Sequence, residues 1–124
     1  MTLVRNADTR DTETPNAVMT TLASPTVGGA ERSLWRVEAE PQAEGPQHAF
    51  DVEQIWTWLD GAATVELGDE SLVVTRGDTV IMPAGVLRRI LAGDRGYTAV
   101  VTASPEARAF GADGREYGVP AWIS

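Results

Sequence analysis

The residues best suited to chemistry lie together in one stretch, HAFDVEQIWTWLDG, which runs from residue 48 to residue 61. Side chains alternate between the two faces of a strand, so its even positions share one face. Those positions include the only histidine of the chain, an amide and three aromatic rings, namely His48, Phe50, Gln54, Trp56 and Trp58. An imidazole transfers protons near neutral pH, and aromatic walls suit a flat organic molecule. The spacing therefore predicts a ligand pocket with His48 as its catalytic acid or base.

The same residues also have structural interpretations. Core packing is the alternative for Trp56 and Trp58, because a small barrel must be filled by large side chains. A hydrogen bond to a backbone carbonyl at the barrel mouth is the alternative for His48. For Gln54, the choice lies between a structural hydrogen bond and an amide that orients a ligand carbonyl or hydroxyl. The sequence leaves these interpretations open.

A second candidate is the pair Arg88 and Arg89 in the apolar segment VLRRIL. Adjacent strand residues point to opposite faces, so one arginine faces the interior, and the sequence does not decide which. The inward guanidinium needs a partner, because an unpaired buried charge is costly. That partner is either a barrel carboxylate or a carboxylate, phenolate or enolate of a ligand. In the second case the inward arginine, for which we take Arg88, becomes a catalytic residue that stabilises an oxyanion.

The elements that must position these residues are short strands. Runs of branched and aromatic residues alternate with turn signals, and helical periodicity is almost absent, which is typical of a β-sandwich or barrel. The eight runs are AVMTTLA, SLWRVEAE, EQIWTWL, ATVEL, SLVVT, TVIM, VLRRIL and YTAVVTA. Asp60-Gly61 predicts a hairpin between the third and fourth runs, and Gly68-Asp69 and Gly77-Asp78 predict further corners. Residues 1–16 are polar and predict a flexible arm, while residues 17–124 predict one barrel with a loop-like C-terminal tail.

Composition limits the classes of function. The 124 residues suit one domain, and the absence of cysteine excludes disulfides, thiolate metal sites and cysteine nucleophiles. All ten basic residues are arginine, which excludes lysine Schiff-base chemistry. A net charge of −8 argues against nucleic acid as a partner, because such partners require a basic face. The sequence contains no apolar run of membrane-spanning length and no signal-peptide core, so we expect a cytoplasmic protein without a membrane partner.

Two stretches resemble the conserved motifs of the cupin superfamily. In GDTVIMPAG, residues 77–85, a glycine is separated by five residues from Pro-x-Gly, as in the second cupin motif. Residues 48–61 are similar to the first motif, in which His-x-His leads to a glutamate, six further residues and a glycine. The resemblance covers roughly residues 34–103 and extends to small single-domain cupins of actinobacteria. It implies an all-β, single-domain jelly-roll barrel (a double-stranded β-helix) and a homodimer.

The resemblance also locates a metal site, and the residues there depart from the family pattern. His48 matches the first motif histidine, but Phe50, Gln54 and Arg88 occupy the positions of the second histidine, the glutamate and the last histidine. A permanently charged guanidinium at a metal position repels a dication and favours an anion. We therefore expect no metal cofactor.

One alternative restores a metal site. A β-bulge that rotates Asp51 or Glu53 inward would give Fe, Mn, Ni or Zn a ligand set with His48 and Gln54. A structure in which both carboxylates point to solvent would argue against that arrangement.

Three functions follow as hypotheses. The first is a metal-independent cupin that holds an aromatic or polyketide-like, anionic compound of secondary metabolism and catalyses its isomerisation, cyclisation or dehydration. Phe50, Gln54, Trp56 and Trp58 would line the pocket. The second is a binding or sensing module without chemistry. The third is a metal-dependent dioxygenase-like cupin with an altered ligand set. The fold alone does not choose among them.

Overall fold

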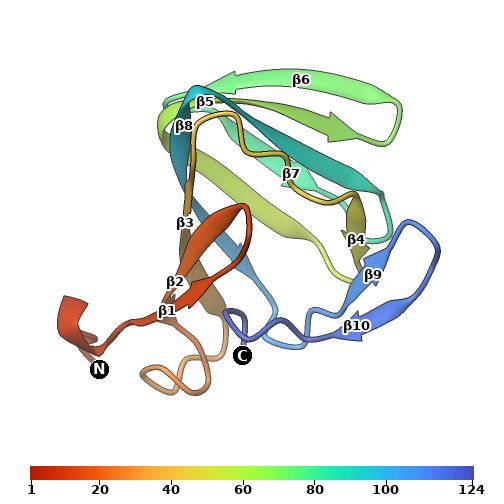
Figure 1. Ribbon diagram of the computed structural model, residues 1–124. Coiled ribbons are helices and arrows are strands. Elements are labelled where there is room, and N and C mark those ends of the chain that lie inside the picture. The colour runs from red at the N-terminus through yellow and green to blue at the C-terminus, as the bar shows by residue number, and fades with distance from the viewer.

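The computed structural model describes residues 1–124 and is built almost entirely of strands (Figure 1). One 3₁₀ turn, η1 (Asn6–Asp8), precedes ten strands. They are β1 (Arg10–Glu13), β2 (Ala17–Ala23), β3 (Ser33–Ala39), β4 (His48–Phe50), β5 (Gln54–Leu67), β6 (Glu70–Thr75), β7 (Thr79–Met82), β8 (Arg88–Ala103), β9 (Ala109–Gly111) and β10 (Glu116–Gly118). The sheet curls around an interior, which confirms the predicted jelly-roll barrel (Figure 1). The structure contains no helix with the length and apolar character needed to cross a bilayer.

The two longest strands, β5 and β8, hold the barrel together. β8 pairs with β3, β4 and β5, and β5 pairs in addition with β6 and β7, all antiparallel. Their register aligns one interior row across four strands, formed by Trp35, Val101, Trp56 and Val80. All four side chains are buried, and they belong to the hydrophobic core. The alternation predicted for the segment after residue 53 is therefore confirmed.

The hairpin predicted at Asp60-Gly61 is wrong. β5 continues through these residues, and its register with β8 shifts on either side of them, which is the mark of a β-bulge. Gly61 does have the positive φ, +76°, that a hairpin turn would need. A bulge uses the same backbone conformation to bend a strand rather than to reverse it. The runs VLRRIL and YTAVVTA, predicted as separate strands, likewise belong to one strand, β8, which bends at Gly96 with φ +70°. The corners at Gly68-Asp69 and Gly77-Asp78 do end strands as predicted.

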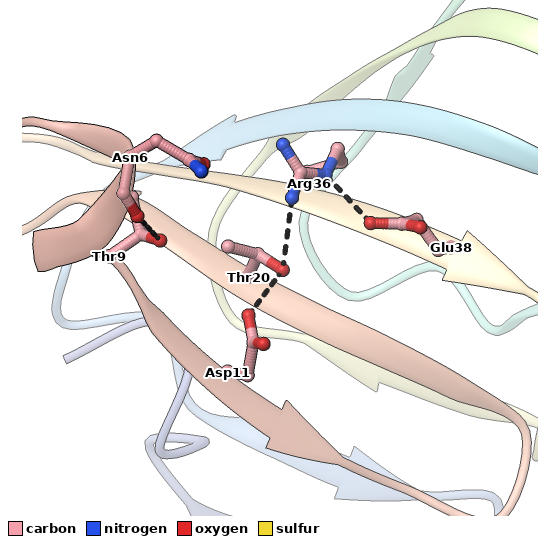
Figure 2. A network of polar contacts seen from close by, with 6 residues as sticks. All are labelled: Asn6, Thr9, Asp11, Thr20, Arg36 and Glu38. Atoms are coloured by element: carbon pink, nitrogen blue, oxygen red, sulfur yellow. Dashed lines mark hydrogen bonds and ion pairs between the residues drawn. The ribbon is translucent and has the colours of Figure 1, made fainter.

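The N-terminal segment differs from the free arm expected for residues 1–16. Its β1 pairs with β2 along the sheet edge, with Asp11 opposite Thr20. Thr20 Oγ1 donates to Asp11 Oδ1 (2.7 Å), and Arg36 Nη2 of β3 contacts the same hydroxyl (3.5 Å), as Figure 2 shows. The polar composition of this segment does not predict the pairing. The hydrogen bonds between β1 and β2 are made by backbone groups, which a polar segment carries as well as an apolar one.

The C-terminal tail is held against the barrel by hydrogen bonds from hydroxyl groups. β9 and β10 form a hairpin beside β4, and the residues after it run back to β2 and β3 (Figure 1). Thr21 Oγ1 donates to Trp122 O (2.7 Å), and the Ser33 hydroxyl donates to Ile123 O. Ile123 is fully buried in the core, so the tail closes this side of the barrel.

Candidate functional site

The barrel encloses a cavity of about 780 Å³ that has a polar end and aromatic walls. Gln54 and Arg88 line it and are buried, whereas Tyr117 lines it and is 62% exposed, so the polar end lies deep and Tyr117 lies at the mouth. The volume lies in the range of cavities that hold drug-sized ligands. His48, Phe50 and Trp56 also line the cavity, so the structure brings together five of the six residues selected as catalytic or pocket residues.

Arg88 is the inward member of the arginine pair. Its β8 position faces His48 of β4 in the register, and the residue is only 2% exposed. Arg89 points outward and pairs with Glu66 (Nε to Oε1, 3.1 Å). Arg88 forms no salt bridge, because the three salt bridges of the protein involve Arg36, Arg89 and Arg108. The internal ion pair, one of the two partners considered for the inward arginine, is therefore absent.

The neutral partners of Arg88 hold its guanidinium in place. Nη2 donates to Gln54 Oε1 (2.6 Å), Nη1 contacts Met82 Sδ (3.3 Å), and the guanidinium carbon lies 4.5 Å from the centre of the Phe50 ring. Burial lowers the pKa of Arg88 to about 10, which leaves the group charged at neutral pH. Hydrogen bonds and the aromatic face offset part of the desolvation cost but supply no negative charge. The deep end of the cavity therefore carries an uncompensated positive charge.

Gln54 provides both an occupied acceptor and a free donor. Its Oε1 accepts from Arg88 Nη2 and from Trp56 Nε1 (3.1 Å). Because both neighbours can only donate, the oxygen must be the atom that faces them. The amide nitrogen, Nε2, is buried and has no hydrogen-bond partner. Buried polar groups normally find a partner, so this donor lacks the acceptor that a ligand would supply.

His48 is held as a neutral imidazole. Its Nδ1 donates to Pro46 O (2.8 Å), because a carbonyl can only accept. The other nitrogen, Nε2, then carries no proton and accepts a long hydrogen bond from Arg88 Nε (3.4 Å). Burial and the charge of Arg88 together lower the pKa of His48 to about 4. The structural alternative, a hydrogen bond to a backbone carbonyl, and the functional one, a place in the cavity, thus hold for the same ring.

The aromatic residues divide between wall and core. Trp56 lines the cavity, but Trp58 does not, which corrects its assignment to the pocket. Trp58 is fully buried behind Trp56, with ring centres 5.5 Å apart, and it also packs on Tyr97. The two-residue spacing correctly predicted that Trp56 and Trp58 share one face of the strand. It did not predict that only Trp56 reaches the cavity.

The alternative in which a β-bulge turns Asp51 or Glu53 inward does not hold. The chain bends at residues 51 and 52, and both carboxylate residues are exposed. Asp51 Oδ1 accepts from the backbone N–H of Arg108 (2.8 Å), which fixes it on the outside.

The residues at the family's metal positions do not fit a metal ion. They are one imidazole whose lone pair faces Arg88, one amide oxygen that already accepts two hydrogen bonds, a phenyl ring and a guanidinium. No group of three or more His, Cys, Asp or Glu side chains comes together in the protein. A divalent metal needs several free N or O donors, and here the nearest group is a cation.

Several residues of the cavity had no signal in the sequence. Trp35 of β3, Tyr97 of β8 and Trp122 of the tail line it, as do Asn16 and Met19 near the N-terminus. They come from segments far apart in the chain, and only the closed barrel brings them together. Trp35 could have been selected by its type, but its register was ambiguous without a known partner strand.

The chain matches one domain family in sequence and several solved structures in fold. The family model described as Cupin domain matches residues 35–102, which is more than half of the chain. No curated protein matches the sequence.

Three solved structures illustrate the similarity in fold. An RmlC-like cupin from Shewanella frigidimarina has a TM-score of 0.70 and 20% identity over 82% of this chain and 87% of its own. KdgF from Halomonas sp. has a TM-score of 0.72 and 20% identity, over 85% of this chain and 94% of its own. The polyketide cyclase RemF from Streptomyces resistomycificus has a TM-score of 0.73 and 22% identity, over 86% of this chain and 81% of its own. At these identities the similarity shows the fold alone.

Proposed function

Because the chain belongs to the cupin family, we propose that its barrel cavity binds a small aromatic or polyketide-like anion without a metal ion. One observation carries the proposal, which is the buried guanidinium of Arg88 that lacks a carboxylate partner at the end of an aromatic cavity. A buried cation of this kind is stabilised most by a ligand that brings the missing negative charge. The aromatic walls supply the apolar surface that binds the remainder of such a ligand.

The experiment compares two ligands of the same shape and different charge. Isothermal titration with 2-naphthoate and with neutral 2-naphthamide, in the presence of EDTA, measures the preference for the anion. We expect 2-naphthoate to bind at least about tenfold more tightly, because charge-assisted hydrogen bonds contribute more than neutral ones. Binding of neither compound, or equal binding of both, would contradict the proposal.

Matched variants assign the preference to one side chain. Arg88→Met should remove the preference for the anion, since methionine fills similar space without charge. Arg89→Met is the control, because Arg89 lies next to it in sequence and points outward. A preference that survives in Arg88→Met would contradict the assignment. Loss of the preference for the anion in both Arg88→Met and Arg89→Met would also contradict the assignment to Arg88.

Catalysis of proton transfer is a second candidate. Two observations support it: the unprotonated Nε2 of His48 lies in the same cavity as the charge of Arg88, and one similar fold is that of a polyketide cyclase. His48 would accept a proton and Arg88 would stabilise the resulting oxyanion during isomerisation, cyclisation or dehydration. Recovery of a bound compound unchanged after prolonged incubation would favour the binding or sensing module over the enzyme. The metal-dependent alternative has no support in the donor set.

A further inference from the structure

The polar side chains at the deep end of the cavity, His48, Gln54 and Arg88, form a chain of hydrogen bonds with Trp56 that uses every acceptor these side chains have. Trp56 Nε1 and Arg88 Nη2 both donate to Gln54 Oε1, Arg88 Nε donates to His48 Nε2, and His48 Nδ1 donates to Pro46 O. The imidazole has one lone pair and the amide oxygen two, so these contacts occupy them fully. Two donors remain without a strong acceptor, namely Gln54 Nε2 and Arg88 Nη1, whose one contact is the Met82 sulfur.

From this arrangement, and resting on the binding function proposed above, we propose that the deep end of the cavity is a donor-only site and that His48 is a positioning residue for Arg88. The ligand group that fits is an acceptor-only oxyanion, such as a carboxylate or an enolate, which takes one hydrogen bond from Arg88 and one from Gln54. An amide, amine or alcohol brings a proton for which His48, Gln54 and Arg88 offer no free side-chain acceptor. An unsatisfied donor buried in a cavity costs binding free energy.

The role of His48 follows from its two nitrogens. The bond from Nδ1 to Pro46 O orients the ring, and Nε2 then presents a lone pair to Arg88 Nε. The ring thereby fixes the Nε end of the guanidinium, Gln54 holds Nη2, and Nη1 contacts neither of the two residues. A proton on Nε2 would replace this acceptor with a donor and place a second cation beside Arg88. Holding the arginine in this way requires only the lone pair of His48 and no transfer of a proton.

Two substitutions separate positioning from proton transfer. In His48→Gln, the amide oxygen can take the place of Nε2 and accept from Arg88, whereas in His48→Asn the shorter amide can reproduce only the donor at Nδ1. Neither amide can carry a proton at neutral pH. We expect His48→Gln to bind 2-naphthoate within about threefold of the unmodified protein and His48→Asn to lose about tenfold or more, because only the first keeps the buried hydrogen bond. Thermal unfolding of both variants without ligand checks that they are folded.

The outcomes decide the role of His48. Equal losses in the two variants would overturn positioning, because they would mean that an imidazole is required. Unchanged binding in both would overturn it as well, because Arg88 would then need no acceptor.

A ligand series tests the donor-only site on the unmodified protein. 2-Acetonaphthone and 2-naphthamide are neutral and similar in shape, but the ketone only accepts hydrogen bonds and the amide also donates. We expect the ketone to bind more tightly by about fivefold, since the amide N–H groups lose water without gaining an acceptor. Tighter binding of the amide would reveal a free acceptor and overturn the donor-only site. The preference for 2-naphthoate over 2-naphthamide could still hold in that case, so the two proposals fail separately.

Discussion

At the scale of the residue, Arg88 is distinctive because it is buried beside neutral groups only. The sequence predicted that one of two adjacent arginines faces inward but could not say which, because register depends on the pairing of β8 with β4 and β5. The outward neighbour has the carboxylate partner and the inward one does not. An arrangement that leaves a cation without a counter-charge costs stability, and such sites are often functional.

His48 makes the stability of the fold depend on pH. Its pKa lies at 6.5 in a free side chain and falls to about 4 in the fold, chiefly through burial. Below about pH 6.5 the unfolded chain takes up a proton that the folded protein does not, so the free energy of unfolding decreases as the pH falls. Between about pH 7 and about pH 5 this contribution amounts to roughly 2 kcal/mol. Urea unfolding at both pH values measures it.

The variant His48→Gln is the control, since it removes the only histidine of the chain. We expect its free energy of unfolding to decrease less over the same range, by the share that His48 contributes. Carboxylates titrate in both proteins and cancel in the comparison. Equal decreases in the two proteins would show that His48 is not held neutral in the fold.

At the scale of the element, the bulges in β5 and β8 explain both a failure and a success of the sequence analysis. The eight predicted runs are all strands, but two pairs of them fuse into β5 and β8, because Gly61 and Gly96 bend a strand without reversing it. A glycine with positive φ suits a turn and a bulge alike, so the local sequence cannot distinguish them. The distinction comes from β8, which runs alongside β5 on both sides of the bend.

Gly61 is therefore expected to be intolerant of substitution. A Cβ at this position would overlap the carbonyl oxygen of Gly96 in β8, in addition to the strain of a positive φ. We expect Gly61→Ala to cost roughly 3 kcal/mol or more of unfolding free energy. Gly77→Ala is the matched control, because Gly77 has φ +90° but open space around its Cβ position. It should cost only about 1 kcal/mol. Equal costs in denaturant unfolding would contradict the close approach of the two bulges.

At the scale of the whole molecule, the predicted jelly roll is confirmed and the pocket is predicted only in part. The motif stretches pointed to His48, Gln54 and Arg88, which lie on the paired strands β4, β5 and β8. The walls formed by Trp35 and Trp122 come from distant segments that meet only when the barrel closes. No local pattern predicts such contacts. The homodimer implied by the family resemblance stays a prediction.

The measurement that tests the central claim most directly is a crystal structure of the complex with 2-naphthoate. The protein would be expressed with iron, manganese, nickel and zinc available, purified without chelator, and studied with anomalous diffraction. We predict the carboxylate at hydrogen-bond distance, about 3 Å, from Arg88 Nη1 and Gln54 Nε2, and no anomalous peak beside them. A metal ion bound by His48 and Gln54, or a carboxylate directed to the mouth at Tyr117, would contradict a metal-independent anion site.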